Sequence, residues 1–149
     1  AITLGTLDGA NVEIVKEAGE ENEYIFGMRV KDIDELRKKG YDPRFPYNNI
    51  TGLKQVVDAL IDGSLSDLGS GIYREIHSLL MERGDQYFVL EDFEDYRRKQ
   101  REINRDYKDK ISWAKKMLKS IANAGKFSSD RTILEYANEI WDIKETKIK

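Results

Sequence analysis

The chain is poor in several residue types, and each shortage excludes a kind of protein. It contains no cysteine, which rules out disulfides, a thiolate nucleophile and a cysteine metal site and fits a reducing cytoplasm. No apolar run approaches the length of a membrane span, and no basic segment precedes a hydrophobic one as in a signal peptide. An initiator methionine is also missing, which fits a fragment or a processed product.

The charge balance argues against two further classes of partner. The formal net charge is -3, and basic and acidic residues are interleaved along the chain. A general nucleic-acid binder or a binder of anionic membrane surfaces needs a basic excess, so neither partner is expected.

Hydrophobic residues make up 40% of the 149 residues, which is enough to form the core of one ordinary domain.

The first residues predict a strand, a tight turn and a helix. Ile2–Leu4 is a short aliphatic run typical of a buried strand. Gly5 and Gly9 bracket the expected turn, and Asp8 can cap a helix that continues through Ala18. This order is half of a βαβ unit, and ligands of open α/β sheets bind outside the carboxyl ends of the strands.

The next segments continue the α/β pattern and then end it. Tyr24–Gly27 predicts a second short strand. Asp32 and Glu35 have the spacing of a capping box for a helix that ends at Gly40. The segment Tyr41–Ile50 holds both prolines, so we expect a loop there and the best internal boundary of the chain.

Beyond residue 50 the pattern predicts a nearly all-helical part. Apolar residues recur at helical spacing and the intervening glycines mark helix ends. The expected helices run from Thr51 to Gly63, from about Ile72 to Gly84, from about Glu91 to Tyr107, from Ile111 to Ala124 with Gly125 as the C-terminal glycine, and from the N-caps Ser128, Ser129 and Asp130 through Trp141.

Several sequence blocks together resemble the α-glucan phosphorylases, the family of glycogen, starch and maltodextrin phosphorylases. The blocks follow in order over nearly the whole chain, and together they are far more specific than any one of them. They are Gly5–Glu13, Glu17–Asn22, Ile25–Val30, Gln86–Tyr96 with its family pattern F-x-V-x-x-D-Y/F-x-x-Y, Trp113, Gly125–Ile133, Tyr136–Ala137 and Glu139–Trp141.

The resemblance implies a fold and a place in it. Enzymes of this family are two-domain glycosyltransferases of the GT-B type, with facing Rossmann-like domains. The chain would be the C-terminal portion of the C-terminal domain, with 1–40 completing the sheet and 51–149 forming a helical part. The expected fold class is therefore α/β, mostly helical after residue 50.

The resemblance also implies an activity for the intact enzyme. Such enzymes transfer α-1,4-linked glucosyl units from glycogen or maltodextrin to orthophosphate and release glucose 1-phosphate. They use the phosphate of pyridoxal phosphate for proton transfer, and the Schiff-base lysine is expected upstream of Ala1. The intact protein would be a cytoplasmic homodimer, and the fragment alone is expected to be inactive, with no catalytic, cofactor-binding or metal-binding residue of its own.

Four residues of the first turn are candidates for a place beside the active site: Thr6, Asp8, Gly9 and Asn11. In one interpretation Asp8 and Asn11 belong to the active-site wall. In the other, Asp8 caps the helix and Asn11 hydrogen-bonds to a neighbouring loop, and this structural interpretation is favoured. Gly9 serves backbone conformation in either case.

Other polar groups are better explained by structure than by chemistry. His77 lies in an amphipathic helix, and one imidazole alone makes no metal site. The acidic residues Glu91, Asp92, Glu94 and Asp95 begin a helix, where carboxylates meet the positive end of its dipole. The basic stretch 97–105 is interrupted by Glu102, which indicates a solvated face with i, i+4 ion pairs.

Two alternatives to the phosphorylase hypothesis remain open from the residues. The chain could be a non-catalytic helical interaction module, although such modules rarely begin inside a βαβ unit. It could also be part of a glycosyltransferase that uses a nucleotide sugar, which the first turn alone would permit. The family blocks argue against this second alternative.

Overall fold

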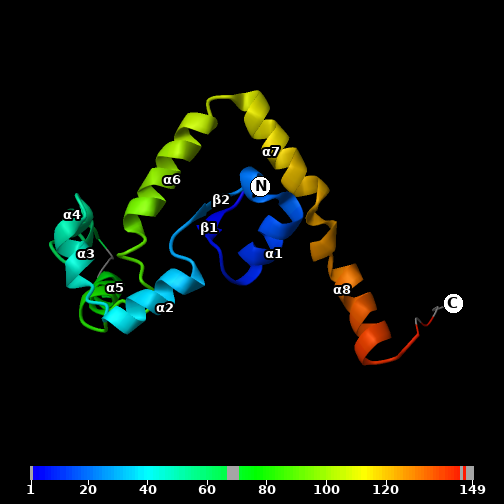
Figure 1. Cartoon of the computed structure of the whole chain (residues 1–149), viewed down its shortest axis with the longest axis horizontal. Coiled ribbons are helices and arrows are strands. Elements are labelled where there is room, and N and C mark those ends of the chain that lie inside the picture. Colours follow the sequence, from blue (N-terminus) through cyan, green and yellow to red (C-terminus); the bar gives the residue numbers. More distant parts are fainter. Residues whose placement is uncertain (1, 67–70, 145, 147–149) are drawn as a thin grey trace.

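The chain begins with a small parallel sheet whose two strands are joined by a helix. This computed structural model describes residues 2–66, 71–144 and 146. The elements of the unit are β1 (Leu4–Thr6), α1 (Gly9–Ala18), a 3₁₀ turn η1 (Glu20–Asn22) and β2 (Tyr24–Phe26). Leu4 pairs with Tyr24 and Thr6 with Phe26 in parallel register, so the carboxyl ends of both strands lie at one edge (Figure 1).

The predicted βαβ half is confirmed, with a shift at its start. The strand expected over Ile2–Leu4 begins only at Leu4, because pairing with β2 and not the aliphatic run sets its limits. Gly5 consequently lies inside the strand and does not open the turn. Gly9 does lie at the turn, in the left-handed region with φ +47°.

The middle of the chain is a group of shorter helices. They are α2 (Val30–Lys39), α3 (Arg44–Asn49), α4 (Leu53–Asp58) and α5 (Ile72–Met81). Two sequence predictions are wrong here. The segment expected to be a loop contains α3, and α2 begins before Asp32, whose carboxylate accepts a hydrogen bond from Arg29 N at 2.9 Å. Asp32 is thus the third residue of the helix and not its cap.

This middle part has a core of its own. Leu53, Val57 and Leu90 are buried together. The partly buried side chains that pack around them are Tyr47, Ile50, Leu80, Met81 and Phe93. Burial of such aliphatic side chains is the main stabilising contribution here, at about 1.5–3 kcal/mol for each fully buried one. The N-cap residue of α4 is Gly52, which has φ +83°, and not Thr51 as the sequence predicted.

Two long helices enclose the sheet unit. α6 (Phe93–Asp106) and α7 (Lys110–Ala122) form the two arms of an arch, with β1, α1 and β2 between them (Figure 1). The α6 arm contacts β2 through the Phe26 and Tyr96 rings, whose centroids are 5.2 Å apart. On the α7 arm, Trp113 stacks on Tyr24 at 5.9 Å. The half-buried Trp113 therefore anchors α7 to β2.

The last elements extend away from this body. They are the 3₁₀ turn η2 (Ala124–Phe127), α8 (Ser129–Glu135) and the π-helical turn η3 (Tyr136–Ile140) (Figure 1). Gly125 lies within η2, so the prediction that it is the C-terminal glycine of α7 is wrong, and Asn123 follows the helix instead. Ser128 does lie at the N-cap of α8, but its side chain makes no capping hydrogen bond.

The fold is mostly helical with a small parallel sheet, in agreement with an α/β class. Among the described residues, all regular elements beyond β2 are helical. Within that same part of the chain, no helix combines the length and the hydropathy that crossing a bilayer would require.

Candidate functional site

The candidate site is the carboxyl edge of the two-stranded sheet, where two turns leave the strands side by side. The first turn follows Thr6 and leads into α1, and the second follows Phe26. Because Thr6 and Phe26 are paired, Leu7 and Gly27 are the first residues beyond the sheet on adjacent strands. This is the edge at which open α/β sheets bind ligands.

In the first turn, the side chains are bound to one another. The Thr6 hydroxyl donates to Asp8 Oδ1 at 3.0 Å, and Asn11 Nδ2 donates to the Thr6 carbonyl at 2.8 Å. A Cβ placed on Gly5 would overlap Asn11 Nδ2, so the glycine makes room for this amide. Asn11 therefore joins the first turn of α1 to the end of β1.

The structure brings the four predicted residues together and corrects one role. Asp8 is at the N-cap position, but its carboxylate makes no capping bond to the helix and pairs with Thr6 instead. Asp8 and Gly9 are exposed, whereas Thr6 and Asn11 are half-buried. Asn11 was expected to hydrogen-bond to a neighbouring loop. Its amide instead donates to the end of β1, which is a local structural contact.

The second turn depends on residues that sequence reasoning assigned differently. Gly27 N donates to Asp95 Oδ2 at 2.8 Å, and Met28 N donates to Asp92 Oδ1 at 2.9 Å. The acidic cluster was expected to serve the dipole of its own helix. The spacing of Asp92 and Asp95, one helical turn apart, was the available signal that both carboxylates share a face.

The two carboxylates differ in their acidity. Burial raises the pKa of Asp92 above its usual value; the Met28 N–H opposes this, while the negative charges of Asp95 and Asp85 add to it. Burial acts in the same direction on Asp95. There, however, the hydrogen bonds from Arg98 and from Gly27 N, together with the positive charges of Arg98 and Lys99, leave the pKa of Asp95 lowered.

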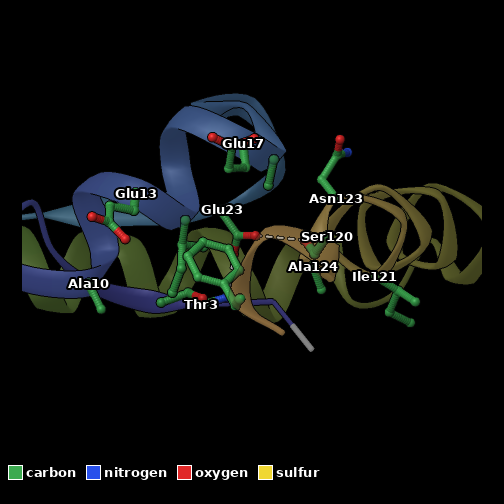
Figure 2. A pocket seen from close by; sticks show the side chains of 12 residues that line it. Thr3, Ala10, Glu13, Glu17, Glu23, Ser120, Ile121, Asn123 and Ala124 are labelled. Atoms are coloured by element: carbon green, nitrogen blue, oxygen red, sulfur yellow. Dashed lines mark hydrogen bonds between the residues drawn. The ribbon is translucent and has the colours of Figure 1, made fainter. Parts of the chain in front are cut away.

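A cavity of about 460 Å³ lies along α1, between this helix and α7 (Figure 2). Glu23, which is 4% exposed, lines it and accepts hydrogen bonds from Thr3 N and from the Ser120 hydroxyl, the latter at 2.6 Å. Lys126 Nζ binds the Glu17 carboxylate at 2.6 Å on the same side. Thr3 and Glu23 precede the two strands, whereas Ala10 lies in the first turn of α1, so the cavity extends along α1 from the amino ends of the strands toward the carboxyl edge.

The other candidates remain structural. Within the described residues, no group of three or more His, Asp and Glu side chains could hold a metal ion, and His77 lies on α5 beside a shallow polar hollow. Arg97 pairs with Glu94 and Lys99 with Glu102, the latter at 3.0 Å. The expected ion pairs on α6 are therefore present, but these pairs have i, i+3 spacing and not the predicted i, i+4 spacing.

Comparison with known proteins identifies the family. The family model described as carbohydrate phosphorylase matches residues 1–143. The chain is 44% identical over 147 residues to the muscle form of glycogen phosphorylase from Homo sapiens, covering 99% of the chain and 17% of that protein.

Two further relatives give the same result. The brain form from Mus musculus is 44% identical over 149 residues, covering the whole chain and 18% of the relative. The muscle form from Oryctolagus cuniculus is 42% identical over 147 residues, or 99% of the chain and 17% of the relative. The chain thus spans less than a fifth of the length of these relatives. Because the family model matches nearly all of its residues, the chain belongs to the carbohydrate phosphorylase family.

Proposed function

We propose that this chain is part of an α-glucan phosphorylase. The whole enzyme transfers terminal α-1,4-linked glucosyl units of glycogen or maltodextrin to orthophosphate and releases glucose 1-phosphate. The observation that carries the proposal is the likeness of 42–44% to glycogen phosphorylases over essentially the entire chain.

In this proposal the chain is the C-terminal portion of a Rossmann-like domain in a two-domain enzyme of the GT-B type. Residues 1–40 complete the sheet, and 51–149 form the helical part. The parallel pairing of β1 and β2 supports this placement, because parallel strands occur in sheets whose faces are covered by helices. The arch of α6 and α7 supplies part of such a cover.

Thr6, Asp8, Gly9 and Asn11 then lie beside the active site and contribute its shape. The Thr6 hydroxyl and the Asn11 amide are already engaged with Asp8 and with the strand end. Their hydrogen bonds hold the turn in one conformation, which favours a positioning role over a direct chemical one.

The cofactor implied for such an enzyme is pyridoxal phosphate, whose phosphate group supplies a proton donor and acceptor when it is bound. The residues of the first turn do not fit its covalent attachment. The segment 5–11 has no lysine, and its one side-chain nitrogen is the Asn11 amide, which donates to the Thr6 carbonyl. The Schiff-base lysine is proposed to lie upstream of Ala1, as the resemblance to the family implies.

The partners proposed for the whole protein follow from this activity. They are glycogen or maltodextrin, orthophosphate and glucose 1-phosphate, with a homodimer as the assembly and the cytoplasm as the location. Nucleic acid and membrane surfaces are not among the proposed partners, because the net charge is -3 with both signs interleaved.

The test is an assay of the full-length protein that contains this chain. Incubation with glycogen and orthophosphate should release glucose 1-phosphate, and omission of orthophosphate should abolish the release. Transfer from a nucleotide sugar, without phosphorolysis, would instead establish the nucleotide-sugar alternative. If a folded full-length protein shows neither activity but still binds other proteins, the alternative of a non-catalytic helical interaction module would be favoured.

A further inference from the structure

Two successive backbone amides at the carboxyl edge are held by carboxylates from a distant helix. Gly27 N and Met28 N donate to Asp95 and Asp92, at 2.8 and 2.9 Å. The carboxylates come from the start of α6, 68 residues further along the chain for Asp95 and 64 for Asp92. The second turn of the edge is thus fixed by the helical part of the molecule and not by its own strand.

The local conformation fits this arrangement closely. Gly27 has φ +81°, a conformation that glycine adopts at little cost. A Cβ at this position would lie 2.6 Å from Asp92 Oδ2, so the carboxylate occupies the space of a side chain. Successive N–H groups in such a turn form a concave anion-binding site, and here the protein fills it with its own carboxylates.

The clamp formed by Asp92 and Asp95 holds the turn that leaves the strand paired with β1. Leu7 and Gly27 leave adjacent paired strands, so a shift of the second turn would be transmitted to the residues that follow Thr6. α6 passes alongside β2 in Figure 1, and the ring contact of Tyr96 with Phe26 fixes the helix next to the last strand residue.

We infer that Asp92 and Asp95 are positioning residues for the proposed phosphorolysis, because they hold the Gly27–Met28 turn that forms part of the active-site edge. The inference rests on the proposed function. It assigns to the helical part a role in shaping the site, in addition to packing against the sheet.

The test uses the full-length protein and the variants Asp92→Ala, Asp95→Ala and the double variant. Glu94→Ala is the matched control, because Glu94 lies in the same helical turn but pairs with Arg97. Amide hydrogen exchange at Gly27 and Met28 reports the clamp directly. Initial rates of glucose 1-phosphate formation give kcat and KM.

We expect faster exchange at both amides and a fall in kcat/KM of about tenfold or more for the double variant, which corresponds to the loss of roughly one to two hydrogen bonds. Glu94→Ala should change neither quantity. Asp92→Asn keeps an acceptor oxygen, so it should restore most of the protection at Met28 and most of the turnover, and it remains informative if an alanine variant fails to fold.

Faster exchange with unchanged kcat and KM would show that the clamp is only structural and would overturn the inference. Unchanged exchange would also overturn it, because the carboxylates would then not hold the turn. A folded wild-type protein without phosphorolysis would remove the proposed function, and the positioning role with it, while the exchange data would still report whether the clamp exists.

Discussion

The Tyr24 hydroxyl donates a 2.9 Å hydrogen bond to the Asp106 carboxylate, although 82 residues separate the two along the chain. This bond joins the first residue of β2 to the last residue of α6. At the other end of the strand, Gly27 is bound by Asp95, near the start of the same helix. α6 therefore runs antiparallel to β2 and is bound to it at both ends.

Replacement of Tyr24 by phenylalanine should destabilise the protein by about 1 kcal/mol, because one partly buried hydrogen bond is lost while the ring remains. The bond from Tyr24 is the main cause that lowers the pKa of Asp106, so this pKa should rise toward its usual value. A lowered carboxyl pKa gives stability that is present at neutral pH and lost as the pH falls through the folded-state pKa.

Urea unfolding followed by tryptophan fluorescence measures this effect, since Trp113 stacks on the Tyr24 ring. The difference between the wild type and Tyr24→Phe should shrink toward acidic pH. Tyr87→Phe is the control, because that side chain is 78% exposed. Equal losses in the two variants would show that the Tyr24–Asp106 bond contributes nothing.

Gly9→Val should damage the protein more than Asn11→Ala. Gly9 has φ +47°, where a β-branched residue costs on the order of 1–3 kcal/mol even though the space around its Cβ is open. Asn11→Ala loses one hydrogen bond, worth roughly 0.5–1.5 kcal/mol. Denaturant midpoints and turnover of the full-length variants decide between them. Loss of turnover without loss of stability in Asn11→Ala would instead place Asn11 in the active-site wall.

Asp92→Asn and Asp95→Asn should affect stability in opposite directions at neutral pH. The pKa of Asp92 is raised in the folded state, so its contribution to stability is present at low pH and is lost as the pH rises through that pKa. The pKa of Asp95 is lowered, so its contribution is present at neutral pH and is lost as the pH falls.

Unfolding free energies of both variants and of the wild type, measured from about pH 3 to about pH 7, show these trends directly. Relative to wild type, Asp92→Asn should gain stability as the pH rises, and Asp95→Asn should lose it. Parallel curves for the two variants would contradict the assigned pKa directions.

The chain on its own should show no phosphorylase activity and no covalent adduct with pyridoxal phosphate, because the attachment lysine is proposed to lie upstream of Ala1. Absorbance of the chain mixed with the cofactor should show no stable aldimine. Detection by mass spectrometry of a borohydride-reduced adduct on a lysine of this chain would refute the proposal.

Expressed alone, the chain should self-associate. The edges of β1 and β2 belong to a sheet of only two described strands, and unpaired strand edges readily bind other chains. Ile140 and Trp141, which are 66% and 53% exposed, add an apolar patch at the C-terminal end. Light scattering over a concentration series measures the association. A monomer at every concentration would show that the chain covers its own apolar surface.

The sequence by itself determined the order of the first elements and the family. The apolar periodicity and the glycines gave α1, β2 and the long helices α6 and α7 to within a few residues, because these are local preferences of the backbone and side chains. The resemblance carried by the consecutive family blocks was confirmed by the family model, which matches residues 1–143.

Only the tertiary structure decided which polar groups meet. β1 begins at Leu4 because β2 pairs there. The Asp8 carboxylate binds the Thr6 hydroxyl, although the local capping pattern predicted a bond to the backbone of α1. Asp92 and Asp95 satisfy amides that lie more than 60 residues away in the chain. Hydrogen bonds of this kind depend on how α6 packs against β2, and a local sequence pattern carries no information about such a long-range approach.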